Sequence, residues 1–326
     1  MKVQELRERL RASDRENVEK AFVESYKQLR KGQKEEIDSV LIEILEGRAV
    51  EKKKDQAVVS FEELEQQIME FVKNAYDQNY FAPNRVIPKS QRPKWRFLVK
   101  NFIKELEKVP LESDNYEKSV KLLADLYHLI CDACNYYLFS TDDPFRSIGW
   151  SQPDFFQLVV KRTFAAGYSR EAILQMLAAA VTGGLSRESL YIKQELVLLG
   201  GLKTSDVKYI AIEEAKKLVE ETEGKLAGLK KYENGRYTLK EKVNECCAMI
   251  LLLSIKLAEP QKGIEYYFKH SRENSMEITL YCALDVADWM DRDDMWIKVY
   301  EYGMKKGIQP RDSLRKAYEE KKKQEA

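Results

Sequence analysis

The chain has 326 residues, which is long enough for two or three domains that each bury a core. Its 55 basic side chains nearly balance its 54 acidic ones, so the net charge indicates neither a nucleic acid nor an acidic membrane as the partner. The chain is 44% hydrophobic, 10% aromatic and 33% charged, which excludes a disordered protein and is typical of a helical one.

No segment reaches the roughly 18 uninterrupted apolar residues of a membrane span. The most apolar run, Cys246 to Leu257, is interrupted by Ser254 and Lys256, and we expect it to form a central core helix. The first residues, MKVQELRERLRASDREN, lack the apolar region of a signal peptide. Five cysteines without a regular framework indicate reduced thiols. We therefore expect a cytoplasmic protein with no membrane partner.

Two helices are expected in residues 1–55, which we predict to form an N-terminal helical hairpin. Ser13 or Asp14 can cap the first helix, and Glu16 follows Ser13 at the spacing of a capping box. The second helix is expected to stop at Gly47, and the charged stretch 48–60 is typical of a linker. The apolar positions that mark the two helices are Val18, Phe22, Tyr26 and Leu29, then Ile37, Val40, Leu41, Ile44 and Leu45.

Residues 56–150 are predicted to form a helical domain with a proline-rich basic loop. A helix capped by Ser60 carries an apolar stripe from Phe61 to Ala75. Three prolines between Asp77 and Pro93 exclude one continuous helix there, because proline lacks the amide donor. A helix resumes at Trp95, and a long one is expected from Tyr116 to Phe139.

Residues 151–326 are predicted to form an array of helical hairpins. Short turns separate the first helices, and each pairs a glycine stop with a serine or threonine start, as helix ends require. Long helices are expected at 205–230 and 238–258, followed by shorter ones that begin near Gly263, Met276, Asp293 and Arg311. The predicted fold class is all-α, with antiparallel helical hairpins stacked as an irregular α-solenoid or multi-helix bundle.

The last hairpin, LYCALDVADWMDRDDMWIKVYEYGMKKGIQP, carries Ala283 and Ala287 in its first helix and Pro310 after its second. In these positions it resembles one tetratricopeptide or pentatricopeptide repeat. The resemblance covers about a tenth of the chain and has no second copy at a fixed period. It implies an α-solenoid with a concave face that binds a partner.

The segment from Asn84 to Lys100 is the strongest candidate for a binding patch. It combines cations with aromatic side chains and contains no acidic residue, a composition that suits phosphates and stacked bases. The alternative, which we favour, is a basic loop whose Trp95 anchors the next helix in the core. The candidate residues for binding a partner or nucleic acid are Arg85, Lys89, Arg92, Lys94, Trp95, Arg96 and Lys100.

Residues 171–192 also resemble a helix-turn-helix, in which Ser186-Arg187-Glu188-Ser189 would open the second helix. That second helix holds Glu188 and Glu195 and ends in a leucine-rich run, which does not suit a DNA groove. We therefore expect a plain helical hairpin here.

Cys131, Cys134 and His128 have the right ligand types for zinc. The two cysteines share one apolar face of a continuous helix and His128 lies on another, so we predict core thiols and neither metal nor cofactor. Asp125, His128 and Asp132 share a polar stripe of that helix. A partly buried cluster of the three would raise the pKa of the histidine and hold two helices in register. We favour the alternative, a polar stripe that faces solvent or an adjacent helix.

Five aromatic or apolar residues, Phe145, Ile148, Trp150, Phe155 and Phe156, crowd the loop between the two predicted helical regions, and we expect them to form a core junction. The sequence thus favours a non-enzymatic scaffold that binds another protein on a helical groove. One alternative is a nucleic-acid-associated protein that uses residues 85–100. The other is an enzyme with an Asp–His site near residues 125–132, in a pocket where polar groups converge.

Overall fold

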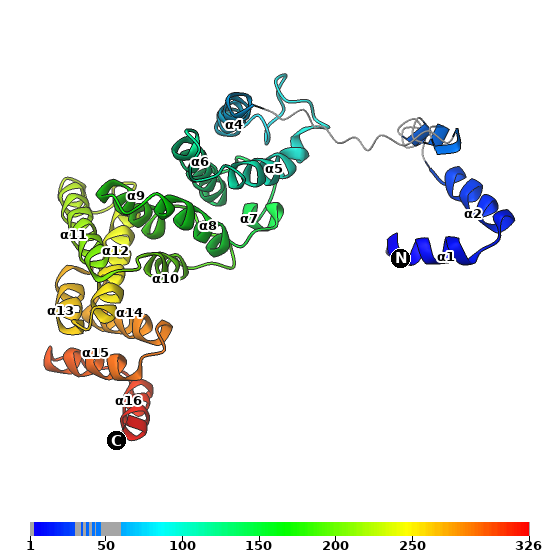
Figure 1. Ribbon diagram of the computed structural model, residues 1–326. Coiled ribbons are helices and arrows are strands. Elements are labelled where there is room, and N and C mark those ends of the chain that lie inside the picture. The colour runs from blue at the N-terminus through cyan, green and yellow to red at the C-terminus, as the bar shows by residue number, and fades with distance from the viewer. Residues whose placement is uncertain are drawn as a thin grey trace. The chain divides into compact units, whose positions relative to one another are not determined.

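The computed structural model describes residues 3–29, 34, 37–38, 41–42, 44–46 and 60–325. Within these ranges every regular element is a helix (Figure 1), which confirms the predicted all-α fold class. The chain divides into two compact units, Met1–Ser60 and Phe61–Ala326. The further boundary expected between residues 150 and 151 stays a prediction.

The first unit contains α1 (Val3–Ala12) and α2 (Arg15–Lys27). Asp14 caps α2, because its carboxylate accepts a hydrogen bond of 2.8 Å from the amide of Asn17. Ser13, the other candidate cap, donates instead to the carbonyl of Arg9 at the end of α1. The predicted second helix of this hairpin and the linker after it lie largely outside the described residues.

The second unit begins with α4 (Phe61–Tyr76), η1 (Arg92–Lys94), α5 (Trp95–Glu107), α6 (Tyr116–Asn135), α7 (Pro144–Ile148), α8 (Gln152–Ala165), α9 (Arg170–Val181) and α10 (Tyr191–Gly201). It continues with α11 (Ser205–Ala227), α12 (Arg236–Lys256), α13 (Pro260–His270), α14 (Met276–Trp289), α15 (Asp293–Lys305) and α16 (Asp312–Glu325). The irregular stretch after Tyr76 is confirmed, since no regular helix forms there before Arg92.

The helix expected to reach Phe139 ends earlier, at Asn135, and that expectation was wrong. Tyr136 takes an extended conformation. The chain then turns so that Phe139 stacks on Trp95, with ring centroids 4.0 Å apart. The short helix α7 was also not expected. Asp143 caps it, and it stops at Gly149, whose φ of +68° suits a residue without a side chain.

Helix α12 lies at the centre of the second unit. Every residue from Cys246 to Ile255 is buried, which confirms the predicted core helix. Helices α9, α10, α11, α13 and α14 all contact it. A helix that is apolar on all sides must be covered on all sides, so α12 requires this ring of neighbours.

The C-terminal hairpin is formed by α14 and α15, which pack against each other. Ala283 and Ala287 are fully buried in α14. Gly303 of α15 faces Leu280 so closely that an added Cβ would lie 2.8 Å from the leucine side chain. The small residues thus let the two helices approach closely, as in helical repeats, while the likeness to tetratricopeptide units stays a prediction.

The expectation that Ser186 to Ser189 opens a helix was wrong, because α10 begins only at Tyr191. The amide of Ser186 donates to the buried Gln152 side chain at 2.8 Å, and Gln194 donates to the hydroxyl of Ser189 at 2.8 Å. These buried hydrogen bonds hold the connection non-helical. Residues 182–190 form a connection that is too long for a helix-turn-helix.

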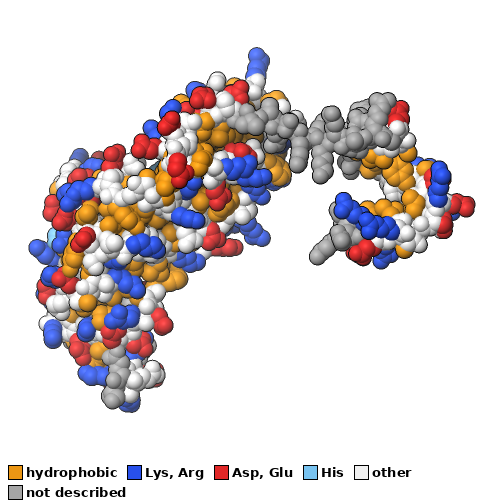
Figure 2. All heavy atoms as spheres, in the orientation of Figure 1, with side chains coloured by type: hydrophobic (Ala, Val, Ile, Leu, Met, Phe, Trp, Pro, Cys, Tyr) orange, Lys and Arg blue, Asp and Glu red, His pale blue; other side chains and the backbone are white. Residues whose placement is uncertain are grey.

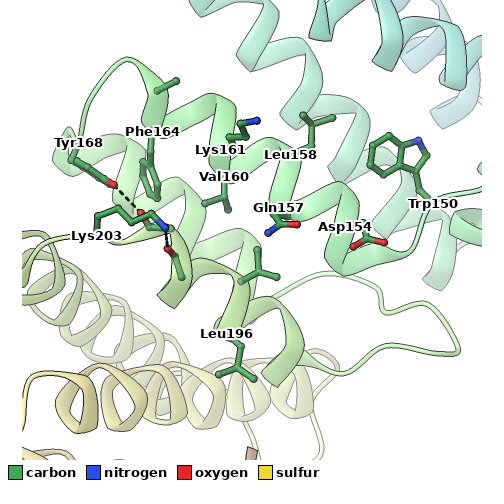
Figure 3. Close-up of a pocket in the computed structure, with 14 residues that line it drawn as sticks. Trp150, Asp154, Gln157, Leu158, Val160, Lys161, Phe164, Tyr168, Leu196 and Lys203 are labelled. Carbon is green, nitrogen blue, oxygen red and sulfur yellow. Dashed lines mark hydrogen bonds between the residues drawn. The ribbon is translucent and has the colours of Figure 1, made fainter. Parts of the chain in front are cut away.

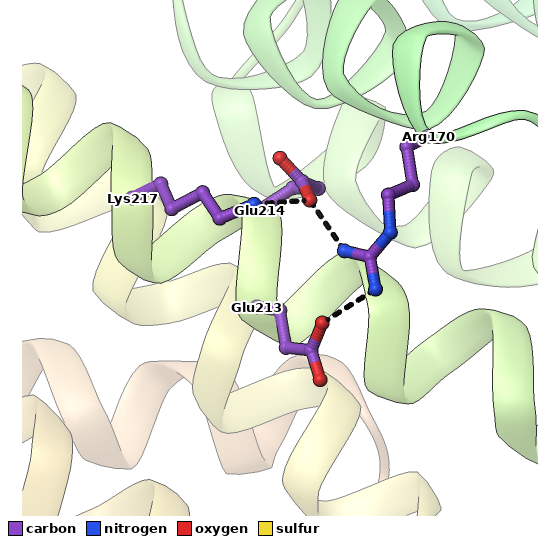
Figure 4. A network of polar contacts seen from close by, with 4 residues as sticks. All are labelled: Arg170, Glu213, Glu214 and Lys217. Atoms are coloured by element: carbon purple, nitrogen blue, oxygen red, sulfur yellow. Dashed lines mark hydrogen bonds and ion pairs between the residues drawn. The ribbon is translucent and has the colours of Figure 1, made fainter.

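An ion-pair network ties the start of α9 to α11 (Figure 4). Arg170 contacts Glu213 at 2.9 Å and Glu214 at 2.7 Å, and Lys217 contacts Glu214 at 2.8 Å. Hydrogen bonds from Lys217 and Arg170 lower the pKa of the Glu214 carboxyl. Elsewhere, positive and negative side chains are interspersed over the visible surface of the second unit (Figure 2).

Glycines allow two close approaches between helices or loops. A Cβ on Gly184 would lie 2.1 Å from the carbonyl oxygen of Cys131 in α6. A Cβ on Gly201 would lie 2.5 Å from Val160 in α8, whereas one on Gly200 would meet nothing within 4 Å. Helix α10 ends at Gly201, where a glycine stop was expected, and Gly201 also lets α10 pack closely on α8.

Replacing Gly184 by alanine should lower the free energy of unfolding by about 2 kcal/mol or more, because a backbone carbonyl cannot move aside as a side chain can. The measurement is urea unfolding followed by circular dichroism. Gly200→Ala is the matched control, and we expect it to be neutral or to stabilise by up to about 1 kcal/mol, since alanine favours a helix. Equal midpoints for the two variants would contradict the close approach.

Candidate functional site

An open groove of about 1100 Å³ follows α8 and α10 (Figure 3). Ten of its fourteen lining residues are apolar or glycine: Trp150, Leu158, Val160, Phe164, Ala165, Tyr168, Leu196, Val197, Gly200 and Gly201. Figure 3 shows Trp150 at one end and Tyr168 at the other. We call this surface the α8–α10 groove.

The polar groups of the α8–α10 groove are Asp154, Gln157, Lys161 and Lys203. Two of them serve local structure, since Asp154 lies in the first turn of α8 and Lys203 donates to the carbonyl of Gly200 at 2.6 Å. The Tyr168 hydroxyl donates to the carbonyl of Gly201 at 2.8 Å and closes the C-terminal end of α10. The groove is therefore a preformed apolar surface that carries the cation of Lys161 on its wall.

A second pocket, of about 340 Å³, lies among α10, α12, α13 and α14. Five carboxyl groups line it: Glu195, Glu241, Glu245, Glu273 and Asp285. None of the described residues that line it is Lys, Arg or His. Its apolar walls include Ile192, Ala248 and Val286, with Trp289 and Leu190 partly exposed. We call it the acidic pocket.

Glu195 is the most unusual group of the acidic pocket. Its side chain is fully buried, and no donor among the described residues reaches either carboxylate oxygen. The carboxyl of Glu245 lies within hydrogen-bonding range. Burial, together with the charge of Glu245, raises the pKa of Glu195 far above its ordinary value. Burial likewise raises the pKa of Glu245 to about 7. Near neutral pH the two carboxyls therefore share a proton.

The predicted basic–aromatic patch divides into structural and exposed residues. The Arg92 guanidinium donates to the carbonyls of Ile87 and Asn84, at 3.0 Å each, and so closes the proline-rich loop. Trp95 is only 4% exposed and lies against Phe139. Trp95 therefore anchors α5 in the core, as the favoured alternative expected, and does not offer its face to a ligand.

The exposed cations of this patch are Arg85, Lys89, Lys94, Arg96 and Lys100. On α5, Arg96, Lys100 and the further exposed Lys104 follow at intervals of four residues, which places them on one face of the helix. Phe97 beside them is 57% exposed, and the Arg96 guanidinium lies 5.0 Å from the centre of its ring. Of the predicted patch, the structure thus leaves a basic stripe on α5, formed by Arg96, Lys100 and the added Lys104, with Phe97 exposed beside it.

The Asp125–His128–Asp132 stripe lies along α6. Asp125 and His128 line an open groove of about 890 Å³ next to α8 and α9, while Asp132 accepts a hydrogen bond of 2.7 Å from Tyr76 of α4. The alternative in which a cluster raises the pKa of His128 is wrong. Burial lowers that pKa and outweighs the opposing effect of the two acids. In residues 60–325 no ion pair joins Asp125 to His128, so the structure assembles no charged Asp–His pair.

Cys131 and Cys134 carry protonated thiols on the buried side of α6. Burial raises the pKa of Cys131 far above its ordinary value and that of Cys134 to about 12. Gln152 donates toward the Cys131 sulfur at 3.5 Å and to the carbonyl of Gly184 at 3.1 Å. A thiol must lose its proton to bind a metal well. These protonated thiols instead pack as apolar groups of the core.

The aromatic cluster around α7 belongs to the core, as expected. Phe145, Ile148, Phe155 and Phe156 are at most 1% exposed, and Tyr127 of α6 contacts three of their rings. Trp150 differs from them, since it is partly exposed and lies at the end of the α8–α10 groove.

Sequence reasoning did not find the acidic pocket, although two signals for it were present. Glu241 and Glu245 lie four residues apart on one helix, a like-charge spacing that costs stability. Glu195 interrupts the apolar part of α10. Each signal points to an unusual side chain but not to its neighbours, because the five carboxyls come from three helices and a loop.

Comparisons with known proteins place the chain in no family, since no protein-family model, no curated protein and no solved structure matches it. Among the described residues, no helix combines the length and the apolar character needed to cross a membrane.

Glu245 should make the free energy of unfolding fall as pH rises from about 4.5 to about 7. The raised pKa means that the folded state holds a proton that the unfolded chain has lost, so ionisation of Glu245 destabilises the fold. Glu245→Gln should remove up to about 3 kcal/mol of this pH dependence. Urea unfolding at a series of pH values measures it, with the exposed Glu265→Gln as control. Parallel pH curves for wild type and Glu245→Gln would refute the assignment.

Proposed function

We propose that this protein is a non-enzymatic scaffold that binds an amphipathic helix of a partner protein in the α8–α10 groove. The observation that supports the proposal most directly is the groove itself, which has a volume of about 1100 Å³ and an open, mostly apolar lining on two packed helices. Monomeric proteins rarely leave a large apolar surface uncovered, and such surfaces mark sites of interaction. Five free cysteines support a reducing compartment such as the cytoplasm.

A helix suits the groove in shape. Helix α8 has 14 residues and is therefore about 21 Å long, so it offers room for a partner helix of about four turns. A helix laid on α8 and α10 would bury its apolar face as in other helix-in-groove complexes. Trp150 and Tyr168, at the two ends, have the aromatic character that is enriched in binding hot spots.

The charge of the groove also constrains the partner. Lys161 projects from α8 on the wall of the groove, and Lys203 lies near the end of α10. A partner helix with an apolar stripe and an acidic residue beside it would match both the apolar floor and these cations. We therefore expect acidic amphipathic helices to bind more tightly than basic ones.

Gly200→Leu tests the groove directly. Because nothing lies within 4 Å of a Cβ at this position, a leucine there would fill space in the groove without disturbing the core. Gly224→Leu is the matched control, since Gly224 also lies on a helix with nothing within 4 Å and lines no part of the groove.

In the experiment, helix-forming peptides are selected from a displayed library on the wild-type protein, and their affinities are measured by fluorescence anisotropy. Gly200→Leu should weaken binding about tenfold or more, which is about 1.4 kcal/mol, and Gly224→Leu should not change it. The proposal fails if no peptide is enriched, or if the enriched peptides bind Gly200→Leu as tightly as wild type.

The basic stripe on α5 supports a second candidate, binding of single-stranded nucleic acid. Three cations at four-residue intervals beside an exposed phenylalanine could contact a phosphate backbone and one stacked base. Arg92 is not part of this surface, because its guanidinium closes the loop. The groove remains the stronger candidate, since the stripe is short.

Charge reversal of Arg96, Lys100 and Lys104 to glutamate should abolish binding of a single-stranded oligonucleotide at about 50 mM salt, without loss of helicity. The control reverses Lys225, Lys230 and Lys231, which are exposed and lie outside the patch. Anisotropy titrations at several salt concentrations provide the measurement. Absence of wild-type binding at low salt, or an equal loss in the control, rules this candidate out.

A further inference from the structure

The acidic pocket is separate from the α8–α10 groove, although α10 contributes to both. Leu196 and Val197 of α10 line the groove, whereas Tyr191, Ile192 and Glu195 line the pocket. The two sites thus use different residues of α10.

The pocket concentrates negative charge without a matching cation. Its carboxyl groups come from α10, α12, α14 and the connection between α13 and α14, and they are Glu195, Glu241, Glu245, Glu273 and Asp285. The other titratable groups that face Glu195 and Glu245 are neutral in their ordinary state: Tyr191, Cys246, Tyr267 and Cys282. Two of the carboxyls have neutral donors close by, since the Asn244 amide reaches Glu273 at 2.6 Å and a hydrogen bond from Tyr237 partly offsets the burial that raises the pKa of Glu241.

Glu195 shows that this charge is not a solvated surface cluster. Apart from the carboxyl of Glu245, no donor among the described residues reaches its oxygens, and Glu195 has no exposed surface. A buried carboxylate without a partner is costly, so the site needs either a proton or a cation. The pocket opens between helices at Glu245, which is partly exposed, so a cation can reach this carboxyl from the solvent side with Glu195 directly behind it.

We propose that the acidic pocket binds an organic cation, an ammonium or guanidinium group, on the paired carboxylates of Glu195 and Glu245. Such a group donates several hydrogen bonds, which the oxygens of Glu195 lack. Trp289 is 45% exposed at the pocket and offers an aromatic face to the same cation. The volume of about 340 Å³ suits one extended side chain or a small amine and not a helix.

A divalent metal fits the pocket less well. In the described part of the chain no group of three or more His, Cys, Asp or Glu side chains is placed to hold a metal ion. The apolar walls of Ile192, Ala248 and Val286 also favour the carbon chain of an organic cation over a hydrated ion.

When the cation binds, it replaces the proton that the two carboxyls share. The cation enters as Glu245 ionises, and the proton leaves to the solvent, so charge is conserved at the pair. Affinity should therefore rise up to about tenfold per pH unit below about 7 and level off above that pH. Titration calorimetry in two buffers of different ionisation enthalpy measures the released proton directly.

The experiment titrates the full chain at constant ionic strength with three organic probes, spermidine, Nα-acetyl-arginine amide and Nα-acetyl-lysine amide, and separately with Mg²⁺ and Ca²⁺. Binding with a Kd of about 1 mM or tighter, with release of a proton near neutral pH, is the expected result. Glu195→Gln should weaken it about tenfold or more, since the amide keeps the shape but not the charge. Glu265→Gln, an exposed change on α13, is the matched control.

The probes also distinguish the source of the cation. Tighter binding of spermidine assigns a free polyamine, and comparable binding of an amino-acid amide assigns a basic side chain of a protein. The proposal is overturned if no probe binds at about 10 mM, if only Mg²⁺ or Ca²⁺ binds, or if Glu195→Gln binds like wild type. Thermal unfolding of Glu195→Gln shows that the variant is folded, so lost binding cannot come from unfolding.

Discussion

The second unit depends on the need to cover α12 on all sides. From Cys246 to Ile255 the helix has no polar face that could remain in water, so five other helices must pack around it. The burial of this apolar helix is therefore a main source of the free energy that stabilises the second unit. The close crossings follow from the same demand. Gly263 of α13, for example, lies so near Ser254 that a Cβ would approach its side chain to 2.6 Å.

The same constraint explains the electrostatics of the acidic pocket. Glu245 lies one residue before the fully buried stretch of α12, and α10 carries Glu195 against it. Desolvation of both carboxyls therefore results from packing that the core requires. The carboxyl pair of Glu195 and Glu245 therefore destabilises an otherwise apolar core. Groups with perturbed pKa values are concentrated at functional sites, because such values serve binding or chemistry.

Helix α10 contributes residues to both candidate sites. On one side Gly201 allows α10 to touch α8, and the residues around Gly200 stay open as the groove. On the other side Glu195 faces the acidic pocket. Different residues of α10 therefore line the two openings.

The sequence by itself determined the helices, most of their ends and the core. Apolar spacing identified α4, α9 and α12, and the caps of Asp14, Ser169 and Thr204 are formed as helix ends require. It also indicated that Trp95 and the aromatic residues around α7 are buried. These features are local, because a helix and its apolar face depend on residues within a few turns.

Only the tertiary structure decided which faces meet. It separated Arg92 and Trp95 from the exposed cations, lowered the pKa of His128 by burial, and brought Glu195 to Glu245 across 50 residues of chain. Desolvation depends on neighbours that come from distant segments, and no spacing rule along one helix contains them. The groove and the acidic pocket likewise arise from the spaces that remain between packed helices.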